Sequence, residues 1–307
     1  MASLVEEQLT QEQIFGVLHK IQYPLKAPNV LPEPTLETLH ELNFRCMTTF
    51  PFELFSLRAT ESRAVSLALD VIYDRLVNKN RGGWCFSLNK LAFALLRGLG
   101  FQVQYTLGRV CKPLNYGDPP VFLGLIHRMS LVRFEDGSKY VFDIGFTTTS
   151  FCPLKLEEGF QVEYFGHKRR IVKIVHNQDE AHVLANPPEE LWQVQEYMGE
   201  DKDGQERWSP CYGFNEQQYY AIDCEVGNFW CSSSPNSPFH QELWVVKGTT
   251  DGHYNVLINK SFKVRSSKGT IKNITIETEQ QRQDILKNYF GIELTEEEWK
   301  HYDIRID

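Results

Sequence analysis

The chain has 307 residues, of which 42% are hydrophobic and 23% are charged. This composition supports about two or three compact units and excludes a disordered chain. The formal net charge is −8, and no Lys/Arg run exceeds the short one at 168–170, so we expect no nucleic-acid partner. No apolar run is long enough to span a membrane, and residues 1–13 are polar without a signal-peptide core, so we expect a cytoplasmic protein without membrane association.

The seven cysteines are scattered along the chain. Their number is odd and none forms a C-x-x-C pair, which argues against a disulfide framework and against a zinc site. We therefore expect reduced thiols and no metal.

Helical patterns occupy the first part of the chain. Thr10 is placed to cap a helix that runs to about Lys20, and Thr35 precedes a second helix that ends before Pro51. The proline-rich stretch 24–34 between them indicates an irregular connection. Apolar spacing over 66–77 continues the helical region.

A cysteine follows a glycine pair where the next helical pattern begins. Gly82 and Gly83 allow a tight turn, and Cys85 precedes apolar residues at helical spacing from Leu88 to Leu99. A helix N-terminus stabilises negative charge, so Cys85 is a candidate thiolate nucleophile. Taken alone, the residue is better explained as a small buried hydrophobe on the core face of the helix, as most free cysteines are.

After residue 101 the pattern changes to strands, which predicts an antiparallel barrel or curved sheet running to about 220. His127 lies in the strand-like run 123–130 and Asp143 in the run 140–146, with a turn signal at 135–138 between them. Pairing across this hairpin could place the carboxylate against the imidazole and leave the other ring nitrogen for a thiol. Taken alone, His127 is better explained as a hydrogen-bonded histidine in a sheet, and Asp143 as a turn or capping aspartate.

The last part of the chain mixes strand and helix signals. Residues 157–210 are the least informative, with an exposed loop at 200–204, and an inserted loop over the barrel is our expectation for them. After residue 225 we expect strands, including a hairpin formed by 243–247 and 254–258, and then a terminal helix over 278–289.

Three motifs together resemble the arylamine N-acetyltransferase family. They are R-G-G-W-C at 81–85 followed by Asn89, F-P-F-E at 50–53, and N-F-W-C-S-S-S-P-N-S-P-F at 228–239. The resemblance implies an α+β fold with a cysteine-protease-like catalytic core. Its expected units are a helical N-terminal domain over 1–100, an antiparallel β-barrel over 101–222 and an α/β lid over 223–307.

The resemblance also implies site residues. Cys85, His127 and Asp143 would form the catalytic triad, with Glu53 paired to Arg81 as support beside Asn89. A buried guanidinium next to the nucleophile needs such a carboxylate partner. By family position, the residues facing the acceptor amine would be Phe146 and Thr148. Candidate hydrogen-bond donors to a CoA thioester are Ser232, Ser233, Ser234 and Ser237, although such a cluster is equally typical of a solvated turn.

The function implied is transfer of an acetyl group from acetyl-CoA to an arylamine, arylhydrazine or arylhydroxylamine, by a ping-pong mechanism through acyl-Cys85. Ser87, Ile144 and Thr147 depart from the family pattern, so malonyl-CoA or propionyl-CoA remains an alternative donor. The same triad also suits an amide synthase or a hydrolase. The third alternative is a catalytically silent binding module.

Overall fold

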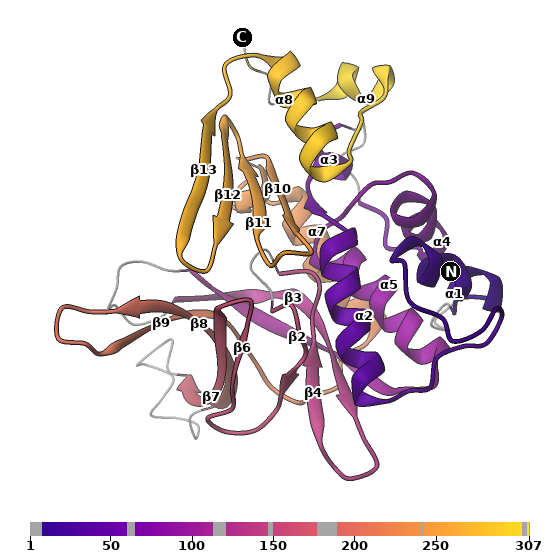
Figure 1. Cartoon of the computed structure of the whole chain (residues 1–307), viewed down its shortest axis with the longest axis vertical. Helices are drawn as coiled ribbons and strands as arrows, with labels where there is room; N and C mark the ends of the chain where they lie inside the picture. The colour runs from indigo at the N-terminus through magenta and orange to yellow at the C-terminus, as the bar shows by residue number, and fades with distance from the viewer. Residues whose placement is uncertain are drawn as a thin grey trace.

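A computed structural model describes residues 8–59, 65–112, 121–146, 150–176, 189–240, 242–302 and 306. The fold is α+β and contains a nearly closed antiparallel barrel, which confirms the expected class. Figure 1 shows the N-terminal helices on one side, the barrel strands below, and a second sheet with the C-terminal helices above. Among the helices of the described ranges, none combines the length and apolar character needed to cross a membrane.

The N-terminal region is helical as predicted. Threonines 10 and 35 cap α1 and α2 by accepting hydrogen bonds from backbone amides. The elements are α1 (Gln11–Lys20), α2 (Leu36–Thr49), the short strand β1 (Phe52–Glu53), α3 (Phe55–Arg58), α4 (Leu69–Tyr73) with the π-helical turn η1 (Asp74–Asn78), and α5 (Cys85–Gly98).

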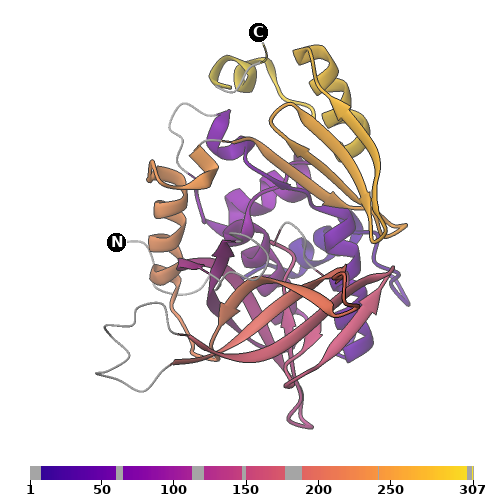
Figure 2. The same cartoon turned by 90° about the vertical axis from the view of Figure 1, so that its left-hand side faces the viewer.

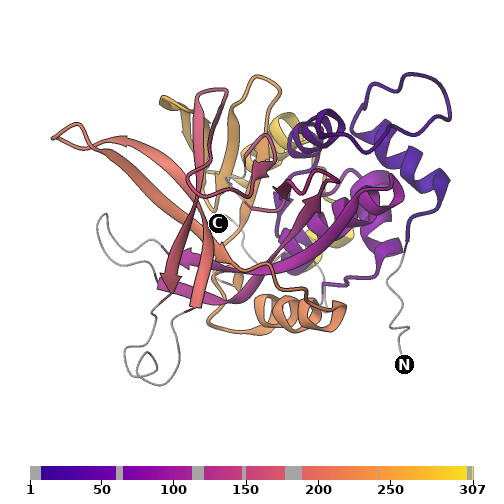
Figure 3. The same ribbon diagram turned by 90° about the horizontal axis from the view of Figure 1, so that it is seen from below.

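The barrel is an eight-stranded antiparallel sheet with the strand order β5-β4-β3-β2-β9-β8-β7-β6. Seen from below in Figure 3, its strands curve around a common interior. The strands are β2 (Gln102–Lys112), β3 (Val121–Arg133), β4 (Lys139–Phe142), β5 (Leu154–Lys155), β6 (Gln161–Tyr164), β7 (His167–His176), β8 (Glu189–Glu200) and β9 (Glu206–Phe214).

The segment 157–210 differs from the expected loop, because most of its described residues form strands of the barrel. Its outer face carries a cation stacked on an aromatic ring, with the Arg170 guanidinium 4.3 Å from the centre of the Trp208 ring. Aromatic residues on an outward strand face weaken the alternation of apolar and polar residues that identifies strands. The predicted loop at 200–204 is the exposed turn between β8 and β9.

The C-terminal region combines a helix, a sheet and closing helices. Residues 221–233 form a helix, α7, which differs from the strand expected after 225, while the hairpin and the terminal helix beginning after Thr278 are confirmed. The elements are α7 (Ala221–Ser233), η2 (Pro238–His240), β10 (Trp244–Gly248), β11 (Tyr254–Ile258), β12 (Ser261–Ser266), β13 (Gly269–Thr275), α8 (Glu279–Ile285), the π-helical turn η3 (Leu286–Phe290) and α9 (Glu296–His301).

The first and last parts of the chain share a sheet. Strand β1 pairs antiparallel with β10, so the five-stranded sheet has the order β1-β10-β11-β12-β13. Figure 2 shows α7 at one edge of the molecule, on the opposite side from this sheet. One apolar core joins the helices to the C-terminal sheet and a second fills the barrel, and β3 contributes side chains to both.

Candidate active site

The turn before Cys85 is held against strand β1 by backbone contacts. The amide of Glu53 donates to the carbonyl of Gly83 at 3.0 Å, and the Gly83 amide donates to the carbonyl of Pro51 at 3.2 Å. A Cβ on Gly82 would lie 1.9 Å from the Pro51 oxygen, so only glycine permits this approach. The turn delivers Cys85 as the first residue of α5, where the sequence predicted it.

Cys85 differs from the other cysteines in its neighbours. All seven cysteines are free and buried. Burial raises the pKa of Cys46, Cys111 and Cys211 to about 12. The Cys85 thiol instead lies at a helix N-terminus, 3.6 Å from the carbonyl oxygen of Ile126, and hydrogen-bonds the His127 imidazole.

His127 and Asp143 form a buried pair across the predicted hairpin. His127 lies in β3, Asp143 directly follows β4, and Nε2 of the ring is 2.8 Å from Oδ2 of the carboxylate. Burial alone would lower the pKa of His127, but the Asp143 charge and the hydrogen bond outweigh it and raise the pKa to about 10. Burial likewise opposes ionisation of Asp143, yet the imidazolium keeps the pKa of that carboxyl below its usual value. The pair therefore favours imidazolium and carboxylate, with Nδ1 left for the thiol.

Asn89 ties the nucleophile's helix to the aspartate. Its Nδ2 donates to Asp143 Oδ1 at 2.8 Å and to the Arg128 carbonyl at 2.5 Å, and its Oδ1 accepts from the Ile144 amide at 3.0 Å. Since Asn89 lies one helical turn after Cys85, the same helix positions both the thiol and the carboxylate. The Asp143 Oδ1 also accepts from the Gly145 amide at 2.9 Å.

Two aromatic rings enclose the imidazole on its barrel side. The ring centroids of Phe146 and Tyr212 lie 5.4 Å and 4.7 Å from that of His127. Burial and a hydrogen bond to Asp143 raise the pKa of Tyr212 well above its usual value, so its phenol stays protonated and donates to the carboxylate. Tyr212 was not predicted from the sequence, where its only signal is an aromatic residue at period two along β9.

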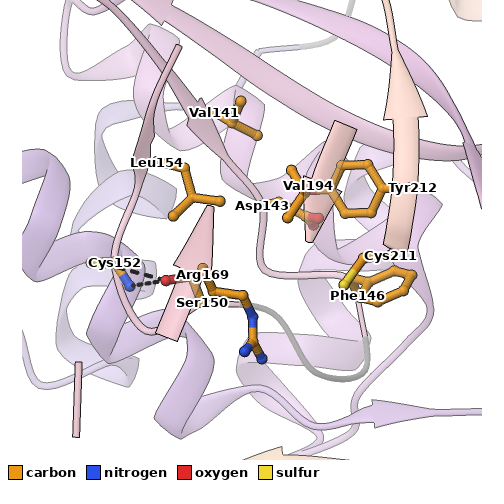
Figure 4. A pocket seen from close by; sticks show the side chains of 10 residues that line it. All are labelled: Val141, Asp143, Phe146, Ser150, Cys152, Leu154, Arg169, Val194, Cys211 and Tyr212. Carbon is orange, nitrogen blue, oxygen red and sulfur yellow. Dashed lines mark hydrogen bonds between the residues drawn. The ribbon is translucent and has the colours of Figure 1, made fainter. Parts of the chain in front are cut away.

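A small cavity lies beside this group in the barrel. Figure 4 shows its lining side chains, with Asp143 and Tyr212 side by side and Ser150 hydrogen-bonded to Cys152. The cavity has a volume of about 10 Å³, which is enough for one water molecule. Phe146 lines this cavity.

The prediction that Arg81 forms an ion pair with Glu53 is wrong, because Arg81 pairs with a different glutamate. The guanidinium Nη2 of Arg81 pairs with Oε2 of Glu298, a residue of α9. Glu53 accepts a hydrogen bond from the Phe55 amide, and it faces the charges of Arg75 and Arg81 without a direct ion pair to either. Burial raises the pKa of Glu53 against the opposing effect of these two cations. The sequence alone carries no signal that a carboxylate on a helix as distant in sequence as α9 contacts Arg81.

The predicted serines lie at the C-terminal end of α7. The Ser237 hydroxyl is fully buried, donating to the Cys231 carbonyl at 2.8 Å and accepting from the Phe239 amide at 3.3 Å. Ser232 donates to the Phe229 carbonyl at 3.1 Å, while Ser233 is exposed and Ser234 caps the helix. Thr148 lies outside the described residues.

Helix α7 packs directly beside the nucleophile. The Trp84 indole Nε1, one residue before Cys85, donates to Asn228 Oδ1 at 3.0 Å. The Asn228 Nδ2 in turn donates to the Val65 carbonyl at 2.8 Å. The Asn228 amide thus joins α7 to the segments that contain Trp84 and Val65.

Comparison with known proteins shows which protein family the chain resembles. A family model described as N-acetyltransferase matches residues 35–299. An arylamine N-acetyltransferase of Mycolicibacterium smegmatis is 30% identical over 270 residues, covering 86% of this chain and 87% of the relative. An N-malonyltransferase of Fusarium pseudograminearum is 27% identical over 81% of this chain and 76% of its own length.

A solved structure has the same fold. The arylamine N-acetyltransferase of Mycobacterium marinum in complex with CoA superposes with a TM-score of 0.77, at 24% identity, over 95% of this chain and all of its own. The family match spans most of the sequence, and the Mycolicibacterium smegmatis relative is similar over most of both chains. Together they assign this chain to a family. This chain therefore belongs to the arylamine N-acetyltransferase family of acyltransferases.

Proposed function

We propose that the protein transfers an acetyl group from acetyl-CoA to the nitrogen of an arylamine, arylhydrazine or arylhydroxylamine, through an acyl-Cys85 intermediate. The observation that carries this proposal is the thiol of Cys85 at the N-terminus of α5, in contact with the buried His127–Asp143 pair. A nucleophile, a base and a group that orients the base are the parts that covalent acyl transfer needs. The CoA complex of the Mycobacterium marinum relative supports a CoA thioester as donor.

The first half-reaction acylates the enzyme. The Cys85 thiolate, paired with the His127 imidazolium, attacks the thioester carbonyl and forms a tetrahedral intermediate. Its collapse breaks the bond to the CoA sulfur, which takes the proton from His127, and leaves an acyl thioester on Cys85. The first backbone amides of α5 are candidates to stabilise the oxyanion, a contribution of about 3–4 kcal/mol per donor.

The second half-reaction transfers the acyl group to the acceptor. The amine nitrogen attacks the thioester of Cys85, and His127 accepts the proton that the nitrogen loses. Cys85 leaves as thiolate and the amide product forms, which restores the starting pair. Because CoA departs before the amine reacts, the kinetics should be ping-pong.

We assign the remaining contacts by position. Phe146, which packs on the imidazole, and Thr148 would face the acceptor. At the end of α7, the serines 232, 233 and 234 would face the donor, whereas Ser237 would support this segment through its backbone bonds. Arg81, Glu53 and Asn89 would hold the nucleophile and the aspartate in place.

The test is the intact mass of the protein after brief mixing with acetyl-CoA, malonyl-CoA or propionyl-CoA, without amine. We expect the mass of one acetyl group to be added, and to be lost again when an arylamine is supplied. The Cys85→Ala variant should gain nothing. The matched control is Cys111→Ala, which removes another buried thiol and should behave as wild type.

Other outcomes separate the alternatives. A preference for malonyl-CoA would correct the donor and align the protein with its Fusarium relative, which is named an N-malonyltransferase. Loss of the thioester without added amine would indicate a hydrolase or an amide synthase. No mass gain with any donor, from folded protein, would contradict the transferase proposal and favour a binding module.

A further inference from the structure

We infer that Glu298, on the C-terminal helix α9, is a positioning residue that fixes the turn presenting Cys85 through its ion pair with Arg81. The inference rests on the proposed role of Cys85 as nucleophile. The two side chains are 217 residues apart in sequence, yet Arg81 Nη2 donates to Glu298 Oε2 in a site where they are only 9% and 29% exposed. Because this ion pair is partly buried, it is screened less than a surface pair and restrains both side chains.

Arg81 is coupled tightly to the nucleophile. Its amide donates to the Arg75 carbonyl at 3.0 Å, and Gly83, two residues later, exchanges backbone hydrogen bonds with the β1 segment. The intervening Gly82 has no free space, since a Cβ there would lie 2.8 Å from Cγ of Glu53. A shift of Arg81 is therefore passed along four residues to the first turn of α5.

The charges around Arg81 balance only when α9 is in place. Arg75 and Arg81 supply two positive charges, and Glu53 and Glu298 supply two carboxylates. Within the described residues, Glu53 Oε1, Arg75 Nη2 and Arg81 Nη1 are buried and have no hydrogen-bond partner, so little else is available to compensate a lost charge. Neutralising Glu298 would leave a buried excess positive charge beside the turn.

Helix α9 is also held by contacts other than this ion pair. Thr295 and Glu298 form a capping box, with Thr295 N donating to Glu298 Oε2 at 2.7 Å and Glu298 N donating to Thr295 Oγ1 at 3.2 Å. Tyr302 packs on Phe55 of α3 at a ring distance of 5.8 Å. Figure 1 shows α9 beside α3, next to the segment that contains β1. The capping box therefore orients the Glu298 carboxylate toward Arg81.

The experiment compares Glu298→Gln with Glu297→Gln. A glutamine at 298 can still accept from the Thr295 amide, so the capping box and α9 persist while the charge is lost. Glu297 is exposed on the same helix, which makes its glutamine variant a matched control for the change in net charge. The readout is the rate of Cys85 alkylation by iodoacetamide, followed by peptide mass as a function of pH.

We expect E298Q to lower this rate about tenfold, because small displacements of a reacting group are costly. Its pH profile should move to higher pH, since the thiolate loses contact with the His127 imidazolium. E297Q should stay within about twofold of wild type, and Glu298→Asp, which keeps the charge, should recover part of the rate.

Two results would overturn the inference. In the first, E298Q melts at a lower temperature but keeps the rate and pH profile of wild type, which would give Glu298 a role in stability alone. In the second, E298D reacts as slowly as E298Q, which would show that charge is not the cause. Wild-type protein without selective alkylation of Cys85 would instead contradict the proposed nucleophile, and the inference with it.

Discussion

The Asp143 carboxylate accepts hydrogen bonds from four groups. Its Oδ2 faces His127, its Oδ1 accepts from Asn89 and the Gly145 amide, and the Tyr212 phenol adds a further bond. A carboxylate bound in this way stays ionised although it is buried. The Asp143 charge in turn keeps the His127 ring protonated and oriented. Asp143 therefore influences the Cys85 thiol through His127, without contacting the thiol itself.

The first prediction concerns that charge. Asp143→Asn should lower the rate of Cys85 acylation by roughly 10³- to 10⁴-fold, because a neutral amide cannot stabilise the imidazolium or fix its tautomer. Rapid-quench mass measurement with acetyl-CoA would follow the rate. Asp136→Asn, in the exposed turn of the same hairpin, is the control and should react as wild type. A D143N variant that retains more than a tenth of the rate would refute this role.

A second prediction concerns Asn89. Replacing it with alanine removes bonds to Asp143 and Arg128 and leaves the Ile144 amide without its acceptor. The free energy of unfolding should fall by about 2–4 kcal/mol, since buried polar groups lose their partners. Urea denaturation would measure the change. A loss below about 1 kcal/mol would mean that water replaces the amide.

Single residues were predictable where local pattern and chemistry coincide. Cys85 follows a glycine pair at the start of an apolar helical repeat, and His127 and Asp143 flank a turn signal. Tyr212 and Glu298 carried no such signal, because their importance comes from distant partners. The pairing of Arg81 with Glu53 came from the family resemblance, and nothing in the local sequence pointed to Glu298 instead.

At the level of elements, α5 and the β3–β4 hairpin meet at very close range. A Cβ on Gly145 would lie 2.6 Å from Cα of Cys85 and 2.7 Å from Nδ2 of Asn89. The segment after β4 therefore lies against the first turn of the helix with no side chain between them. This contact sets the distance between the Cys85 thiol and the His127–Asp143 pair.

The third prediction tests this contact. Gly145→Ala should separate the helix from the hairpin, lowering the free energy of unfolding by about 1–3 kcal/mol and the acylation rate by roughly 10- to 100-fold. Gly124→Ala in β3 is the matched control, since its nearest atom would be at 3.9 Å. Thermal melts and acylation rates would be measured on both. Equal rates for the two variants would show that the site tolerates the displacement.

Elements were predictable when one periodicity dominated. The caps at Thr10, Thr35 and Thr278 and the apolar repeats behind them located α1, α2 and α8. The barrel predicted over 101–222 includes β6 to β9, but the bounds of these strands carried no clear signal, because several of their outward residues are aromatic and stack on cations across the sheet. Helix α7 was missed because its outer face is apolar, with Ile222, Val226 and Phe229 exposed, so the usual amphipathic contrast is absent.

For the whole molecule, the buried pair makes stability depend on pH. The pKa of His127 rises from 6.5 to about 10 on folding. The stabilisation of the folded state by the charged His127 is therefore complete below pH 6.5. It is lost as the pH rises toward 10. Asp143, whose pKa is lowered, contributes above its usual 3.8 and loses that contribution as the pH falls through its folded value.

The fourth prediction follows from this linkage. Between pH 6.5 and 10, the wild-type melting temperature should fall more steeply than that of the His127→Asn/Asp143→Asn double variant, which lacks both titrating groups. One proton corresponds to at most about 1.4 kcal/mol per pH unit. Calorimetry across this range would give both slopes. Parallel slopes would show that the imidazole does not remain charged in the folded protein.

The pairing of β1 with β10 has a consequence for protein synthesis. The ribosome releases the N-terminal end first, so Cys85, His127 and Asp143 emerge well before residues 244–248 exist. Until then the strand that braces the glycine turn has no neighbour on its other edge, and α9 has not been made. A nascent chain that has not yet reached α9 therefore lacks both the pairing of β1 with β10 and the Arg81–Glu298 ion pair that flank the turn before Cys85.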